Sequence, residues 1–266
     1  MKAPAADSEA LIGMLTRLKL TAIRDQLDTL LDTATRRKLT LIDTVKLLCE
    51  AEVARKDERR IQMATSIAKF PFVRTLEGFE FAAQPSLDPK LIRELATCRW
   101  VGNGDALLLL GPPGVGKTHL AVALGREAIH HGYSTLFTSA TALVTALTKA
   151  HHAGRLEERL VHYAKPKLLI VDELGCLPLE ANAAHLFFQL VSRRYERGSM
   201  LVTSNRAVSE WGTVFGDNVV ATAILDRLLH HSHVIRIRGD SYRLREKRRS
   251  GLVPQRGTEK QLEKLT

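Results

Sequence analysis

The sequence predicts an α/β protein in which a helix-covered parallel sheet follows a small all-helical N-terminal domain. Two patterns carry this prediction. Between residues 104 and 237, short apolar runs alternate with longer amphipathic stretches, as strands and crossover helices do in a parallel sheet. Before residue 70, apolar side chains recur at the three- and four-residue spacings of α-helices. A composition that is 45% hydrophobic and 26% charged is typical of a soluble globular protein.

The N-terminal domain is expected to span residues 1–70. One helical stretch covers residues 11–31, and a second runs from Thr40, a possible N-cap, to about Lys69. The second stretch carries four cations that Asp57 and Glu58 do not balance, namely Arg55, Lys56, Arg59 and Arg60. Two interpretations stay open, a solvated helix face and a surface that contacts phosphates.

Residues 71–103 are rich in aromatic residues, proline and glycine, and are expected to form a connector with a short helix at 89–98. The sheet domain is expected at 104–249, including a basic C-terminal segment, with a polar tail at 250–266. Its expected strands are 107–110, 135–139, 168–171, 200–203 and 234–237. Its expected helices are 117–131, 140–150, 154–164, 181–197 and 221–230. Because strands alternate with helices, ligands are expected at the carboxyl ends of the strands.

The formal charge of +10 is concentrated in the two flanks. Residues 1–75 carry 14 basic and 10 acidic side chains, residues 76–235 carry 15 of each, and residues 236–266 carry 10 and 4. Basic ends around a neutral centre favour nucleic acid as a partner. The widely spaced Cys49, Cys98 and Cys176 argue against a disulfide framework, and no secretory signal or membrane span is visible. We therefore expect a cytoplasmic protein without a membrane partner.

The segment Gly111-Pro-Pro-Gly-Val-Gly-Lys-Thr118 fits the phosphate-binding pattern GxxxxGK[ST] between an expected strand and an expected helix. Its glycines allow backbone N–H groups to turn toward phosphate oxygens, and the helix adds the positive end of its dipole. Lys117 is expected to reach the terminal phosphates, and Thr118 to supply a hydroxyl to Mg²⁺. The expected nucleotide contacts are Gly111, Pro112, Pro113, Gly114, Val115, Gly116, Lys117, Thr118 and His119.

Polar residues at the ends of later strands complete the expected site. Asp172 suits a Mg²⁺ ligand, and Glu173 suits the base that polarises the attacking water. Asn205 suits a residue that orients the water or touches the γ-phosphate, although asparagine at a strand end is also a common turn former. Arg227 has two open interpretations, a local ion pair with Asp226 and an arginine finger that reaches a neighbouring subunit's nucleotide.

The histidines include three adjacent pairs at 130–131, 151–152 and 230–231. No cysteine or acidic residue stands at metal-ligand spacing from them in the sequence, so zinc is not expected.

In combination, the motifs GPPGVGKT, LLIVDELG, TSN and LDRL resemble AAA+ ATPases of the initiator and helicase-loader group. A finer similarity is to the IstB family of insertion-sequence ATPases, and it covers the chain to about residue 249. It rests on LEGFEFAAQPSLD (76–88), LLIVDELGCLPL (168–179), SRRYERGSMLVTSN (192–205), SEWGTVFGD (209–217) and ILDRLLHHSHVIRIRGDSYRLR (224–245). The resemblance implies a P-loop NTPase fold of AAA+ type. The segment from Gly239 to Pro254 is too short for the usual helical lid of AAA+ proteins, so no separate lid is expected and no sensor 2 residue is assigned.

The same resemblance implies an ATP-dependent regulator of transposition that oligomerises on double-stranded DNA, hydrolyses ATP with Mg²⁺ and delivers or activates target DNA for a partner transposase. It implies that the Thr203 strand lies beside the Asp172 strand, which makes Asn205 sensor 1, and that Arg227 acts in trans. DNA binding is expected to be largely independent of sequence, since no base-reading motif is visible. The expected phosphate contacts are the 55–60 cations with Arg236, Arg238, Arg243, Arg245, Lys247, Arg248 and Arg249.

The sequence also leaves three other functions to consider. A DnaC-like replicative helicase loader is the main alternative, because it shares several of the motifs. A DNA-architectural protein with an inactive nucleotide site conflicts with the intact Lys117, Thr118, Asp172 and Glu173. A small-molecule kinase leaves the basic flanks without a purpose.

Overall fold

The computed structural model describes residues 5–176 and 181–242, and the chain divides into two compact units, residues 1–63 and 64–266. The first unit is helical. It contains α1 (Ala5–Arg17), α2 (Thr21–Arg36) and most of α3 (Leu41–Ala68). Thr40 caps α3 as predicted, because its hydroxyl accepts a hydrogen bond from the N–H of Asp43 at 3.2 Å.

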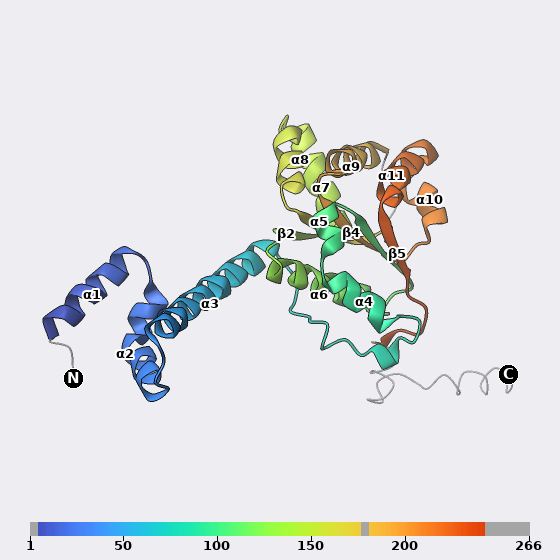
Figure 1. Cartoon of the computed structure of the whole chain (residues 1–266). Coiled ribbons are helices and arrows are strands. Elements are labelled where there is room, and N and C mark those ends of the chain that lie inside the picture. Colours follow the sequence, from blue (N-terminus) through green and yellow to red (C-terminus); the bar gives the residue numbers. More distant parts are fainter. Residues whose placement is uncertain (1–4, 177–180, 243–266) are drawn as a thin grey trace, which may run out of the picture. The chain divides into compact units, whose positions relative to one another are not determined.

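The second unit begins within the last turns of α3 and contains a five-stranded parallel sheet (Figure 1). The strands are β1 (Ala106–Leu110), β2 (Thr135–Ser139), β3 (Leu168–Leu174), β4 (Ser199–Ser204) and β5 (Ser232–Arg236). The α-helices are α4 (Pro89–Ala96), α5 (Arg99–Asn103), α6 (Lys117–His130), α7 (Ala140–His152), α8 (Leu156–Ala164), α9 (Ala181–Arg194), α10 (Trp211–Phe215) and α11 (Asn218–His230). Two short 3-10 helices are η1 (Phe81–Ala83) and η2 (Val208–Glu210).

The strand order is β2-β3-β4-β1-β5, so the Thr203 strand lies beside the Asp172 strand, as expected. Successive side chains of a strand face opposite sides of the sheet. Leu108 of β1 therefore packs with residues of α7, α9 and α11, whereas Leu107 packs with residues of α4 and α6. Figure 1 shows these helices on the two faces of the sheet. The predicted fold class, a helix-covered parallel sheet that follows an all-helical N-terminal part in the sequence, is confirmed.

Several element boundaries differ from the predictions for local reasons. The helix predicted to end at Cys98 ends at Ala96, because Cys98 adopts a left-handed φ of 56° before α5 begins. The α11 helix begins at Asn218 rather than 221, because the Asp217 carboxylate accepts hydrogen bonds from the first-turn N–H groups. The prediction did not include α5 and α10, because five residues are too few to show a helical period.

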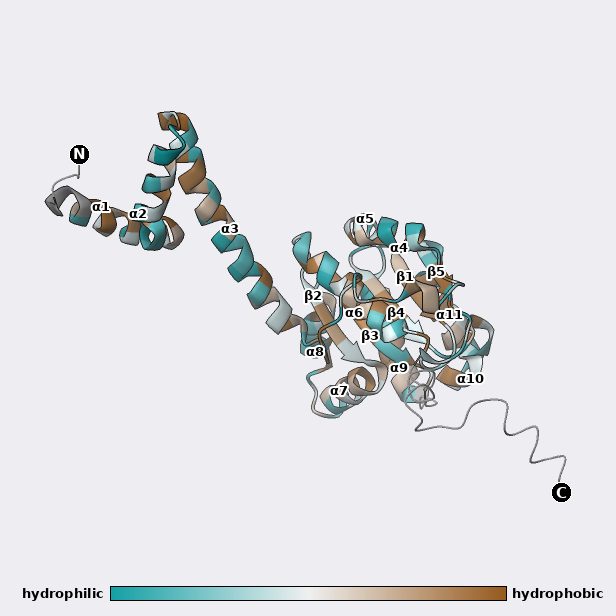
Figure 2. Ribbon diagram, turned by 90° about the horizontal axis from the view of Figure 1, so that it is seen from below, coloured by the Kyte–Doolittle hydropathy of each residue, from teal (hydrophilic) through white to brown (hydrophobic). Residues whose placement is uncertain are grey.

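The first unit has a small core made by Leu15, Ile23 and Leu27. Figure 2 shows hydrophilic and hydrophobic residues mixed along α3, and Leu41 and Ile42 at its start are 88% and 81% exposed. Within the described residues, no helix combines the length and the apolar character that crossing a bilayer requires.

Candidate active site

The loop between β1 and α6 has the backbone of a phosphate-binding loop. Gly116, which immediately precedes α6, has a φ of 97°, and a Cβ there would lie 2.7 Å from the ring of Phe79. A side chain is therefore excluded both by conformation and by space. The N-cap residue Gly116 has no side-chain oxygen to offer the first N–H groups of α6, and a helix start of this kind suits an anion.

Lys117 is half-buried, and its ammonium group donates hydrogen bonds to the carbonyl oxygens of Gly111 and Pro112 at 2.7 and 2.8 Å. These contacts hold the cation at the mouth of the loop. An ammonium in this position can exchange carbonyl oxygens for the oxygens of a terminal phosphate, which carry more negative charge.

Thr118 and Asp172 face each other across the end of the sheet. The Thr118 hydroxyl lies 3.0 and 3.1 Å from the two carboxylate oxygens of Asp172. Asp172 is only 6% exposed, and the Thr203 hydroxyl of β4 also donates to it at 2.6 Å. A buried carboxylate beside a hydroxyl offers the hard oxygen ligands that Mg²⁺ prefers, so this pair fits a magnesium ion.

Glu173 is turned out of the sheet by its backbone. It has a left-handed φ of 62°, and the pairing of β3 with β4 shifts between Val171 and Leu174. The N–H of Glu173 donates to the Thr203 hydroxyl at 2.9 Å, which fixes this conformation. The carboxylate is consequently exposed to the cavity while its neighbour Asp172 is buried. A left-handed non-glycine residue costs about 1 to 2 kcal/mol, and such strain is often found at functional sites.

These side chains meet at one cavity of about 670 Å³. Lys117, Thr118, Glu173 and Asn205 line it on the side of the sheet. The opposite wall comes from the connector, at Phe72–Thr75, Gly78–Glu80 and Gln84, together with Tyr242. The structure thus brings together the predicted catalytic residues of this chain with one exception, Arg227.

His119, one of the predicted nucleotide contacts, ties the loop helix to the connector. Its Nε2 lies 2.9 Å from the carbonyl oxygen of Thr75, and its ring packs edge-on against Phe79. Burial and the charge of Arg74 lower the pKa of His119, although the bond to Thr75 opposes this shift. His119 therefore supports the cavity wall as a neutral side chain at pH 7.

Three further residues shape this site without a signal in the sequence that marks their roles. Thr203 was seen only as part of the strand-end TSN, yet it holds both Asp172 and the backbone of Glu173. Phe79 covers Gly116, and nothing in a connector sequence marks this contact. Gln84 is 2% exposed and lines the cavity, and no described residue pairs with its Oε1. A buried acceptor without a partner is costly unless a ligand supplies a donor.

Arg227 lies elsewhere. Its guanidinium stacks over the ring of Phe188 at 4.5 Å and donates to the carbonyl oxygen of Ala223 at 3.2 Å. It is absent from the residues that line the cavity described above. A contact between Arg227 and a nucleotide would therefore need a second copy of the chain.

The predicted DNA-binding residues fall into three groups. In the first unit, Arg55, Lys56 and Arg60 pair with Asp25, Glu52 and Asp57 at 3.6, 3.6 and 3.3 Å, so the cluster is better balanced than the sequence suggested. Arg236 and Arg238 are exposed at and just after the end of β5. The others, Arg243, Arg245, Lys247, Arg248 and Arg249, lie outside the described residues.

Comparison with known proteins places the sequence among insertion-sequence proteins. The profile of the family described as IstB-like ATP binding protein matches residues 13–250. The chain is 44% identical over 232 residues to the ATP-binding protein of insertion sequence IS5376 from Geobacillus stearothermophilus, and the alignment covers 87% of this chain and 92% of that protein. It is 42% identical over 245 residues to the IS21 ATP-binding protein of Pseudomonas aeruginosa, which covers 92% of each.

Two solved structures share the architecture. AMPPCP-bound DnaA from Aquifex aeolicus matches with a TM-score of 0.52 and 21% identity, covering 71% of this chain and 59% of that one. DnaI matches with a TM-score of 0.52 and 23% identity, covering 62% and 91%. At these identities the likeness concerns the fold, and it agrees with the helix-covered parallel sheet described above.

Proposed function

This chain belongs to the family of IstB-like ATP-binding proteins, and from this premise we propose that it is an ATP-dependent DNA-binding regulator of transposition. It oligomerises on duplex DNA, hydrolyses ATP with Mg²⁺ and delivers or activates target DNA for a partner transposase. The observation that carries the proposal is the cavity lined by the phosphate loop, Thr118 and Glu173, at which the Thr118 hydroxyl bonds to the buried Asp172.

In the proposed hydrolysis, each residue of the site has a distinct role. The loop amides and Lys117 bind the phosphates, and Thr118 with Asp172 holds Mg²⁺, which neutralises phosphate charge when bound. Glu173 takes a proton from the attacking water, for which its exposure to the cavity is suited. Asn205 orients that water or the γ-phosphate. Arg227 supplies its charge from a neighbouring subunit, which makes turnover depend on assembly.

Replacing Glu173 by Gln tests the ATPase. Glutamine keeps the size of the side chain but cannot accept the proton, so turnover should fall by about 10² to 10⁴-fold while ATP affinity stays near that of the wild type. Phosphate release and binding of a fluorescent ATP analogue measure the two quantities. Glu210→Gln is the control, because Glu210 is an exposed carboxylate that pairs with Arg206 and does not line the cavity. Undiminished turnover in Glu173→Gln would remove Glu173 from the mechanism.

DNA binding is proposed to use the cations of both basic flanks through phosphate contacts. In the first unit, Arg55 and Arg59 can be replaced together by Gln. If both contact phosphates, the slope of log affinity against log salt should become shallower by about 2. Fluorescence anisotropy with random-sequence duplex DNA measures this slope. Lys90→Gln with Arg93→Gln on α4 is the matched control, since it removes the same charge from a helix outside both flanks. If the slope changes equally in the control, the loss of net charge explains the result, and phosphate contacts by Arg55 and Arg59 are not supported.

The alternative function, loading of a replicative helicase, differs in its partner. Binding of the purified chain to a transposase encoded beside it supports the transposition proposal. Stable binding to a replicative helicase, with a preference for single-stranded DNA, would contradict it.

A further inference from the structure

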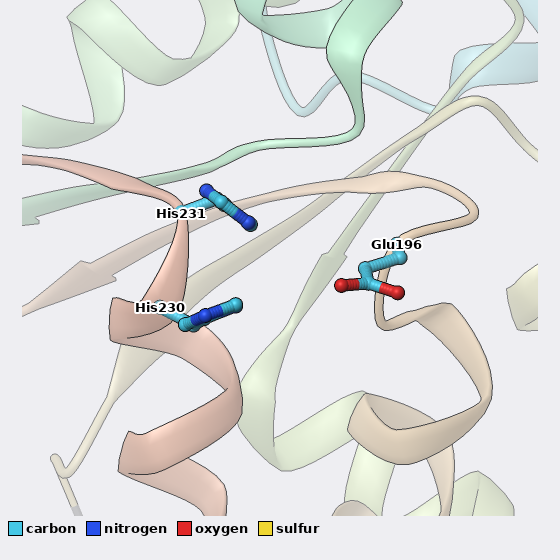
Figure 3. Close-up of side chains that lie close together, drawn as sticks. All are labelled: Glu196, His230 and His231. Atoms are coloured by element: carbon cyan, nitrogen blue, oxygen red, sulfur yellow. The ribbon is translucent and has the colours of Figure 1, made fainter.

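A cluster of side chains that can bind a metal ion lies at the opposite end of the strands from the phosphate loop. Glu196 is in the turn between α9 and β4, and His230 and His231 lie where α11 leads into β5. One ligand atom from each of the three residues lies within 4.8 Å of the others (Figure 3). The sheet order β4-β1-β5 places the turn before β4 and the junction before β5 on either side of β1.

We propose that Glu196, His230 and His231 bind one Zn²⁺ ion, with water completing the coordination. Two imidazole nitrogens and a carboxylate oxygen form a donor set that suits zinc, and sites with three protein ligands and one water are common. Tetrahedral zinc needs ligand atoms only about 3.3 Å apart, so the three side chains have to approach one another slightly. Glu196 and His231 are exposed, so their side chains can change rotamer to make this adjustment.

Neighbouring groups hold the cluster in position. The Tyr195 hydroxyl lies 2.7 Å from Nδ1 of His230, which orients the ring and leaves Nε2 as the metal ligand. The carbonyl oxygen of His231 accepts a hydrogen bond from the N–H of Ala106 at 2.8 Å, which fixes its backbone against β1. Glu196 has a left-handed φ of 57° in its turn. Glycine would adopt this conformation without strain, so a glutamate here is consistent with a use for its side chain.

Two adjacent histidines alone do not make such a site, as a second exposed pair in this chain shows. His151 and His152 at the end of α7 are also exposed, but no group of metal-ligating residues within the described part of the chain includes them. The pair at 230–231 differs because the fold brings a carboxylate from a distant turn to the two imidazoles. The ion would join the end of α11 to the turn before β4, and so steady the helix that carries Arg227.

The test is zinc binding to the full-length chain without a histidine tag, measured by titration calorimetry in a buffer that does not bind metals. Replacing His230 and His231 together by Ala should weaken binding at this site by more than about tenfold. Glu196→Gln should weaken it as well, and His151→Ala with His152→Ala should not. Zinc should also raise the thermal unfolding midpoint of the wild type, but not that of the His230/His231 variant, provided that circular dichroism shows both to be folded.

Three results would overturn the proposal. The first is zinc affinity in the His230/His231 variant equal to that of the wild type. The second is an equal loss in the His151/His152 control, which would mean nonspecific binding by surface histidines. The third is an unchanged affinity in Glu196→Gln, which would remove the carboxylate and with it the three-ligand site.

Discussion

The two units of this chain differ in how completely they bury their apolar side chains. The second unit covers both faces of its sheet, and the side chains from Leu107 to Leu109 of β1 have no exposed surface. The first unit has only the small core cluster described above, while Leu18, Leu41 and Ile42 remain largely exposed. A sheet covered on both sides buries enough apolar area to stand alone, whereas a small helical unit is marginal by itself.

This difference separates the proposed roles. The second unit holds the proposed catalytic groups against a rigid sheet, which suits chemistry that depends on distances such as the 3.0 Å between Thr118 and Asp172. The first unit combines exposed apolar and basic side chains with a small core, which suits a surface that gains stability by contacting a partner. The two tryptophans, Trp100 and Trp211, are buried in the second unit, so their fluorescence reports on that unit alone.

The largest effect is expected from Leu107→Ala. Leu107 has no exposed surface and lies on β1, which has a neighbouring strand on each side, so its truncation should lower the free energy of unfolding by about 2 to 5 kcal/mol. Urea denaturation followed by tryptophan fluorescence measures this loss. Val219→Ala is the control, because Val219 is 79% exposed on α11. If the two variants lose equal stability, the second unit does not depend on its buried core. The contrast with the first unit, which has only a small core, would then be wrong.

Features that depend on neighbouring residues could be predicted from the sequence, whereas contacts between distant segments could not. The apolar run at 107–110 and the glycine-rich loop after it are local signals, and they were enough to predict β1, the loop and the start of α6. The Thr203 hydroxyl that bridges Asp172 and Glu173 depends on the pairing of β3 with β4, which no local pattern contains. For the same reason, the approach of Glu196 to His230 could not be read from spacing in the sequence.

The next largest effect is expected in the first unit, from Glu52→Gln. Glu52 of α3 is 4% exposed, and its carboxylate accepts hydrogen bonds from the N–H groups of Ala22 and Ile23 at 2.7 and 3.3 Å. Because it caps α2 from another helix, losing its charge should cost this unit about 1 to 2 kcal/mol. Far-ultraviolet circular dichroism should show an earlier loss of helix, while the tryptophan transition stays in place.

The same carboxylate predicts a pH dependence. Burial opposes its ionisation, but the hydrogen bonds from Ile23 and Ala22 and the charge of Lys56 outweigh burial and lower the pKa of Glu52. Its contribution is therefore complete above the unfolded-state pKa of about 4.3 and is lost as pH falls through the lower folded-state pKa. Glu50→Gln is the control, since Glu50 is exposed and its carboxylate lies 3.8 Å from the ammonium group of Lys46. The measurement is the free energy of unfolding of the first unit as pH is lowered. If it falls equally in Glu52→Gln and Glu50→Gln, the cap is not the cause of the acid sensitivity.

The smallest effect is expected from Ile42→Ser. Ile42 is 81% exposed at the start of α3, so a polar replacement should change the stability of the isolated chain by less than about 0.5 kcal/mol. Circular dichroism melts at a low and a high protein concentration measure this change. If the substitution is neutral at low concentration but destabilises the chain at high concentration, Ile42 is covered in an oligomer, and the first unit completes its core through assembly. A large loss at both concentrations would instead mean that the first unit buries this residue within one chain, and its contrast with the second unit would disappear.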